Sequence, residues 1–160
     1  MAYRYCPKCG QINHQKLSRA CTTEGCRADT IEVTKNLQAL ALKFAKSDYN
    51  IYNAIETHTT YTNKNHKYTS VRIVVEFAEP YNIDRVFPNL PDNWEAHGSF
   101  SVRHGIVIER IVELSCVFEY ARLGFKTTLK SAIQYEIDKM IDWLDNAGHI
   151  ACLRLSGFWL

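Results

Sequence analysis

The sequence lacks the long apolar stretch that would place the protein in a membrane. None of its 160 residues belong to a run approaching the roughly 18 uninterrupted apolar residues of a membrane-spanning helix. The first residues, Met1-Ala2-Tyr3-Arg4-Tyr5, also lack the apolar core of a secretory signal peptide. We therefore expect no membrane partner and a location in the cytoplasm, where thiols stay reduced.

Common catalytic motifs are missing as well. The sequence contains no phosphate-cradling glycine loop, no His-Glu-x-x-His and no Gly-x-Ser-x-Gly. It also lacks internal repeats and any large excess of charge, since the net charge is only +2. Residues 1–36 hold six basic and three acidic residues, whereas residues 37–160 hold thirteen basic and fourteen acidic ones. Attraction to phosphate groups should therefore come mainly from the amino-terminal segment.

Cysteine is what this segment has in quantity. Cys6 and Cys9 form one close pair, and Cys21 and Cys26 form a second. Two such pairs supply the four soft ligands that a structural zinc ion prefers at tetrahedral corners, with His14 as a spare ligand. Two disulfides or unlinked thiols are the alternatives. A closed four-cysteine site leaves no open position for chemistry, so we expect one structural Zn²⁺ ion.

The remaining pattern predicts an α+β protein of two parts, a zinc module over residues 1–35 and an α+β domain over residues 36–160. Apolar residues at helical spacing predict a helix over residues 36–46. A polar turn at Asn63-Lys64-Asn65-His66 joins two segments rich in Thr, Tyr, Val and Ile, which is typical of a hairpin. We expect an antiparallel sheet that two helices cover on one face.

The rest of this domain should contain a second hairpin and a second helix. Residues 80–98 are rich in proline and read as a long irregular connection. His104-Gly105 marks the turn of the second hairpin. Thr127 or Thr128 should cap the second helix, and residues 151–160 should return to the sheet as a strand. Cys116 and Cys152 sit among apolar neighbours, so we expect them to be buried, inert thiols.

The segment Tyr5-Cys6-Pro7-Lys8-Cys9-Gly10 resembles the first knuckle of a zinc ribbon. The second half, Cys21-Thr22-Thr23-Glu24-Gly25-Cys26, resembles the Ogr/Delta group of phage late-transcription activators. The likeness covers about 30 residues, and the eleven residues between Cys9 and Cys21 form a shorter loop than that group has. Because those proteins contact promoter DNA and RNA polymerase, the resemblance implies a phage-encoded, non-enzymatic transcription regulator that docks on nucleic acid or a nucleic-acid-handling protein.

Basic residues near the cysteines and in the first hairpin are the candidates for contacting phosphate groups. They are Lys8, Lys16, Arg19, Arg27, Lys64 and Lys67. Tyr61 and Tyr68 flank the hairpin lysines, where aromatic rings can stack on bases. A cross-strand tyrosine pair and a solvated lysine turn are the alternative interpretations.

Two other functions remain open at this point. Trp94, Phe158 and Trp159 would form a partner-binding surface if exposed, as in a homodimer or a protein-only inhibitor or adaptor of a host enzyme. The two terminal aromatics can equally complete the core as an edge strand. Glu109 and Glu113 share one strand face, with Glu76 near them and His97 and His104 at hand, so a metal-dependent hydrolase is a further alternative.

Overall fold

The computed structural model describes residues 2–6, 8–10, 12–13, 20–21, 23–26, 28, 30–47, 49–77, 81–103, 106–121 and 128–146. The side chains of residues 2–3, 12–13, 99–103 and 106–111 are not among the described groups. The strands are β1 (Ala2–Tyr5), β2 (Ile12–Asn13), β3 (Ile31–Thr34), β4 (Ile51–Asn63), β5 (His66–Phe77), β6 (Trp94–Arg103) and β7 (Ile106–Ala121). The helices are η1 (Lys35–Leu37), α1 (Gln38–Lys46), α2 (Ile83–Val86) and α3 (Leu129–Asn146).

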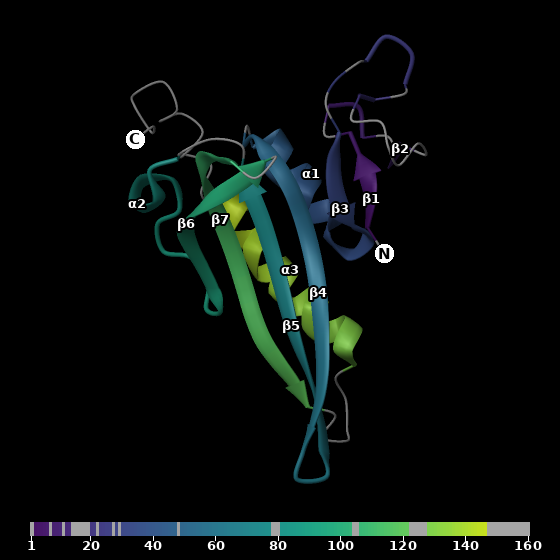
Figure 1. Ribbon diagram of the computed structural model, residues 1–160, viewed down its shortest axis with the longest axis vertical. Coiled ribbons are helices and arrows are strands. Elements are labelled where there is room, and N and C mark those ends of the chain that lie inside the picture. The colour runs from purple at the N-terminus through teal and green to yellow at the C-terminus, as the bar shows by residue number, and fades with distance from the viewer. Residues whose placement is uncertain are drawn as a thin grey trace.

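The described strands form one seven-stranded sheet in the order β2-β1-β3-β4-β5-β7-β6 (Figure 1). The α+β class is therefore confirmed. The expectation of an antiparallel sheet is wrong, because β3 and β4 run parallel, in register at Glu32↔Asn53 and Val33↔Ala54. Parallel neighbours need a crossover, and the segment of η1 and α1 between them supplies it. The division into residues 1–35 and 36–160 stays a prediction, although the sheet runs on from one part to the other.

The core lies between one face of this sheet and the helices α1 and α3, which lie behind the sheet in Figure 1. Val71, Ile73, Val75 and Phe77 of β5 are buried, whereas Arg72 between them is exposed. Burial along this strand therefore alternates with a period of two, as expected when one face of a sheet is packed. The apolar stripes of α1 and α3 complete the core, and Lys43 pairs with Asp145 where the two helices meet. No described helix is long and apolar enough to cross a membrane.

Both hairpins form where the sequence predicts them. The β4–β5 turn places Lys64 at φ 48° and Asn65 at φ 68°, the two left-handed residues of a tight hairpin turn whose twist matches that of its strands. The second hairpin closes at Arg103↔Ile106. Thr128 caps α3, since its Oγ1 accepts a hydrogen bond from the Ser131 amide at 3.1 Å. The strand predicted over residues 151–160 lies outside the described residues, as does Cys152.

Residues 81–98 are more ordered than an irregular connection. They include α2 and residues 94–98 of β6, so the prediction of one long irregular connection is wrong. Trp94 opens β6 opposite Cys116 and is only 4% exposed. Its Nε1 donates to the carbonyl of Glu136 at 3.2 Å. The expectation that Trp94 belongs to an exposed partner surface is therefore wrong, because its ring fills the space between β7 and α3.

Glu136 is a buried carboxylate that the helical pattern alone would assign to solvent. It is 5% exposed and accepts a hydrogen bond from Asn93 Nδ2 at 3.1 Å. Lys139 Nζ lies 2.8 Å from its other oxygen, and the Cys116 thiol donates to that oxygen at 3.6 Å. Cys116 is fully buried, as predicted, and burial raises the pKa of its thiol to about 12. Glu136 therefore ties α3 to both β7 and the start of β6.

Replacing Glu136 with alanine should destabilise the protein by about 2 kcal/mol, because Asn93, Cys116 and Lys139 lose the buried carboxylate that they contact. Urea unfolding followed by circular dichroism measures the change. Asp142→Ala, on an exposed position of the same helix, is the control and should change stability by less than about 0.5 kcal/mol. Equal effects of the two substitutions would contradict the role assigned to Glu136.

Candidate metal centre

The first pair of cysteines lies in a tight turn directly after β1. Cys6 follows Tyr5, the last residue of the strand, and both are buried. The amide of Gly10 donates to the carbonyl of Cys6 at 2.8 Å, and Gly10 has φ +76°, a conformation that glycine adopts without steric cost. This turn brings Cys9 back beside Cys6.

The second pair lies in a turn that faces the first. The amide of Cys21 donates to the carbonyl of Ala28 at 2.8 Å, and the amide of Cys26 donates to the carbonyl of Thr23 at 3.1 Å. Gly25, at φ +78°, allows the chain to reverse before Cys26. The amide of Thr23 also points at the Cys21 sulfur, at 3.5 Å. β1 leads into the first cysteine turn and pairs with β3, which follows the second cysteine turn along the chain. The sheet therefore holds both cysteine pairs at one end.

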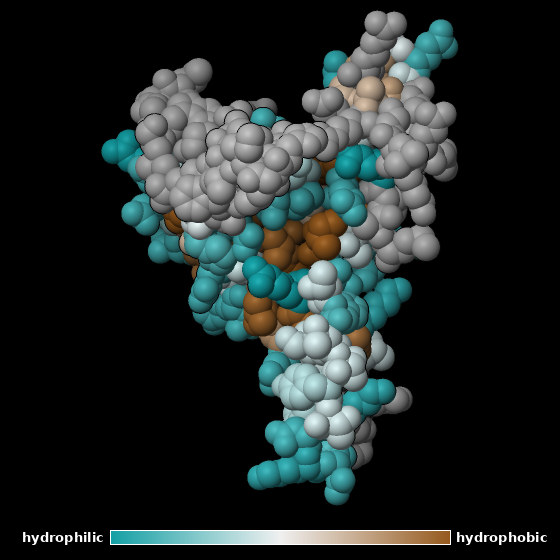
Figure 2. All heavy atoms as spheres, viewed as in Figure 1, coloured by the Kyte–Doolittle hydropathy of each residue, from teal (hydrophilic) through white to brown (hydrophobic). Residues whose placement is uncertain are grey.

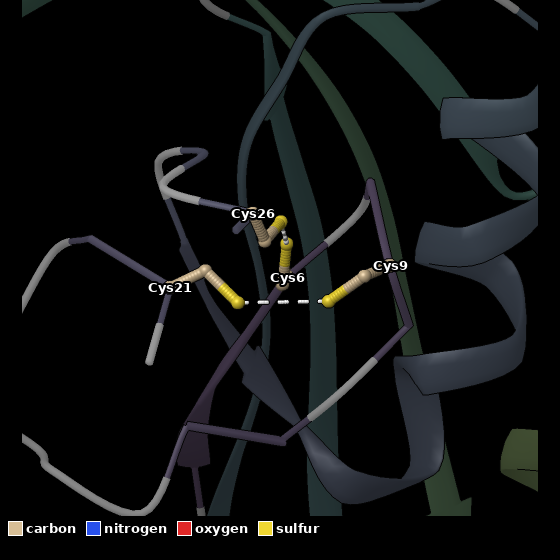
Figure 3. A group of neighbouring side chains, drawn as sticks. All are labelled: Cys6, Cys9, Cys21 and Cys26. Atoms are coloured by element: carbon tan, nitrogen blue, oxygen red, sulfur yellow. Dashed lines mark hydrogen bonds between the residues drawn. The ribbon is translucent and has the colours of Figure 1, made fainter. Parts of the chain in front are cut away.

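The four sulfur atoms converge on one point (Figure 3). Sγ of Cys6 lies 3.7 Å from Sγ of Cys26, and Sγ of Cys9 lies 3.5 Å from Sγ of Cys21. All four sulfurs lie within 4.8 Å of one another. In a regular tetrahedron with metal–sulfur bonds of about 2.3 Å, the sulfurs are about 3.8 Å apart. These separations fit a shared metal ion and are far too long for disulfide bonds, which need about 2.05 Å.

Burial makes this group dependent on a cation. Desolvation raises the pKa of the Cys6 thiol to about 12, although the backbone amides of Cys9 and Lys8 oppose the rise. Without a cation, Cys6 therefore stays protonated at neutral pH. A bound divalent ion reverses this preference because it stabilises the thiolate directly, and the same amides then donate to a charged sulfur. The group can thus hold a metal ion, and holding it displaces protons.

We expect the protein to bind one divalent metal ion per chain, as measured by elemental analysis after exhaustive dialysis. Cys9→Ser and Cys21→Ser should each lower the metal content toward zero, because three thiolates and an alcohol hold the ion far more weakly. Cys116→Ser is the matched control, since this cysteine lies in the core away from the cluster. Full metal content in the Cys9 and Cys21 variants would rule out the site.

The predicted phosphate-contacting residues fall at two separate places. Lys8 is exposed in the first cysteine turn. Lys64 and Lys67 are exposed at the tip of the β4–β5 hairpin, which Figure 1 places at the opposite end of the long axis from the cysteine turns. Five sequence-predicted residues of this kind or of the partner surface, and the spare ligand, lie outside the described residues: Lys16, Arg19, Arg27, Phe158, Trp159 and His14. Tyr61 and Tyr68 form the cross-strand pair, with ring centroids 5.4 Å apart.

A row of polar side chains crosses four strands on the face of the sheet that the helices do not cover. Asn53, Glu76, Glu113 and His97 lie in register on β4, β5, β7 and β6. His97 Nε2 lies 2.9 Å from Glu113 Oε1, to which Arg72 also donates at 3.1 Å. Glu113 is 8% exposed, so it is not the solvent-facing glutamate that strand alternation predicts.

This row does not form a metal group. Among the described residues, the four cysteines are the set of metal-ligating side chains whose atoms come together. The side chain of Glu109, the other carboxylate of the hydrolase hypothesis, and His104 lie outside the described groups. Arg72 instead compensates the charge of Glu113 by direct contact, and His97 shares a hydrogen bond with the same oxygen, which is a sufficient structural reason for the burial of that carboxylate.

Glu76 is the member of this row whose ionisation destabilises the folded protein. Burial raises the pKa of its carboxyl, the Asn53 amide that donates to it at 3.0 Å opposes the rise, and the charge of Glu113 adds to it. The folded protein therefore holds this proton to higher pH than the unfolded chain does. Stability should fall as the pH rises from the unfolded pKa of a glutamate through the raised folded value.

Glu76→Gln should accordingly raise the melting temperature at pH 7, where the wild-type carboxyl carries an unfavourable charge. The difference from wild type should shrink as the pH falls below the unfolded pKa of a glutamate, because the carboxyl then becomes protonated in both states. Differential scanning calorimetry across this range provides the measurement. Glu95→Gln, at an exposed position on β6, is the control and should show no such trend. A lower melting temperature for Glu76→Gln at pH 7 would contradict the assigned direction.

No known family model matches the chain, and it matches no curated protein and no solved structure. The likeness to zinc ribbons and to the Ogr/Delta group rests on the cysteine segments alone.

Proposed function

We propose that this protein is a non-enzymatic zinc protein that docks on nucleic acid or on a nucleic-acid-handling machine, in the manner of a transcription regulator. The convergence of four cysteine sulfurs within 4.8 Å is the observation that carries the proposal. Zn²⁺ is the ion that four thiolates in a tetrahedron suit best, and a closed site of this kind stabilises structure rather than performing chemistry.

The surroundings of the cysteines support a docking role. Lys8 is exposed between Cys6 and Cys9, so its ammonium group is presented by a turn that the metal makes rigid. The excess of basic residues in residues 1–36 adds to this attraction for phosphate groups. The resemblance of residues 5–26 to zinc ribbons and to phage transcription activators points in the same direction.

The proposal predicts that the zinc-loaded protein binds labelled DNA or RNA with micromolar or tighter affinity in fluorescence anisotropy. Binding should weaken steeply between 50 and 200 mM salt, because bound lysine and arginine side chains release counterions from the phosphates. Lys8→Ala should weaken it several-fold, and Lys16→Ala with Arg19→Ala should do the same. Lys46→Ala, an exposed lysine of α1, serves as the charge-matched control.

Removing the metal with a chelator should abolish this binding and loosen the cysteine turns, because ligation energy is folding energy in so small a unit. Unchanged binding by the metal-free protein would overturn the role of the metal centre. If the zinc-loaded protein binds no nucleic acid at low salt, docking on nucleic acid itself is wrong, and a protein partner becomes the function to test.

A further inference from the structure

The β4–β5 hairpin extends beyond the strand that supports it. Within the described residues, β7 pairs with β5 as far as Tyr68↔Ala121, whereas β4 and β5 continue through Thr62↔Lys67 and Asn63↔His66. We refer to residues 62–67 as the hairpin tip. Figure 1 shows the tip projecting from one end of the molecule. All six of its residues are exposed.

The tip stands on a rigid base. The rings of Tyr61 and Tyr68 stack at an interplanar angle of 21°, and Oγ1 of Thr60 lies 3.4 Å from Oγ1 of Thr69 on the neighbouring pair. The Tyr61 hydroxyl donates to Glu119 of β7 at 2.6 Å. These contacts hold the base of the tip to the sheet, so little conformational freedom would be lost on binding.

The charge of the hairpin has one sign. The sequence contains no aspartate or glutamate from Thr57 to Val75, whereas it contains Lys64, Lys67 and Arg72 in that stretch. Glu119 pairs in register with Ser70, which in turn pairs with Thr59, about 16 Å along the strand from Lys64 at roughly 3.3 Å per residue. Figure 2 shows hydrophilic side chains covering the narrow end of the molecule. A projecting cationic ribbon without acidic side chains is complementary to a polyanion.

The dimensions of the tip indicate which kind of nucleic acid it can bind. Two paired strands lie about 4.8 Å apart, so with side chains they fit the major groove of B-form DNA, which is about 12 Å wide. The three residues from Tyr61 to Lys64 span about 10 Å, close to the groove depth of about 8.5 Å. The major groove of an A-form RNA helix is too deep and narrow for such an element.

We propose that the hairpin tip enters the major groove of B-form DNA. Lys64 and Lys67 contact the phosphates that line the groove, and the amides of Asn63 and Asn65 face the base edges, where asparagine can pair with adenine. The inference rests on the proposed function, docking on nucleic acid, and deepens it by naming the duplex and the element that binds it.

The test compares the zinc-loaded full chain with a variant that removes both tip charges but preserves the turn. Lys64→Asn retains a residue that tolerates the left-handed conformation, and Lys67→Thr retains a residue that favours strands. Lys35→Ala with Lys46→Ala removes the same charge from two exposed positions of η1 and α1. Circular dichroism and melting temperature verify that both variants fold.

Binding to a DNA duplex of about 20 base pairs, and to an RNA duplex of the same sequence, is measured by anisotropy at several salt concentrations. The tip variant should bind the DNA about tenfold more weakly at 0.1 M salt, and its salt slope should fall by about 2, since each lost phosphate contact removes about 0.9. Methylation of guanine N7, an atom in the major groove, should be blocked by wild type and restored by the tip variant. The control variant should behave as wild type.

The remaining outcomes distinguish failure of the hairpin inference from failure of the proposed function. DNA binding that the tip variant retains in full would overturn the hairpin inference and leave the proposed function intact. Equal affinity for the RNA duplex, or salt-dependent binding without protection of N7, would overturn the placement in the B-form major groove. Absence of binding by wild type to any nucleic acid would overturn the proposed function and the hairpin inference together.

Discussion

The parallel pairing of β3 with β4 is the constraint on which the rest of the structure depends. It joins the strands that carry the cysteines to the long strands that form most of the sheet, and α1 crosses between them over the shared core. Tyr5, immediately before Cys6, is 1% exposed and belongs to this core. The first metal-ligating turn is therefore continuous with a buried strand rather than tethered to it. Arg4 strengthens the connection, because its Nε donates to Thr30 Oγ1 at 3.0 Å just before β3 begins.

Most individual elements could be predicted from the sequence, because their signals are local. The hairpin at Lys64-Asn65, the helix capped by Thr128 and the alternation from Val71 to Phe77 each depend on the turn chemistry or periodicity of neighbouring residues. The parallel pair was missed because β3 has only four residues and its partner lies beyond a helix. The order strand, helix, strand around residues 31–55 is typical of a parallel crossover, and Ile31 and Val33 alternate with Glu32 as in a strand. The proximity of the cysteines, however, made the same segment consistent with the end of a metal module.

The polar and metal-ligating residues also include some that the sequence could predict and some that it could not. The spacing of the cysteines was sufficient to predict their convergence, since each pair is closed by its own turn. The burial of Glu113, Glu136 and Trp94 could not be predicted, because it depends on residues far away in the sequence. Glu136 meets Asn93 across 43 positions, and Glu113 is buried only because Arg72 and His97 arrive from two other strands. Alternation and helical periodicity describe one element at a time, so they cannot identify a carboxylate whose partners come from another element.

The length of β4 has a mechanical consequence. Its thirteen residues run from beside β3, which follows the second cysteine turn, to the hairpin turn, a path of about 43 Å at 3.3 Å per residue. Groups bound at the two ends of such a strand are kept apart by a hydrogen-bonded sheet instead of a flexible linker, so their separation varies little. When a group binds at one end of the strand, the effective concentration of a second group at the other end rises only if the two groups lie at the matching distance. If groups do bind at both ends, the length of the sheet would set the distance between them, and a change in that length would alter which pairs of sites the protein can bridge.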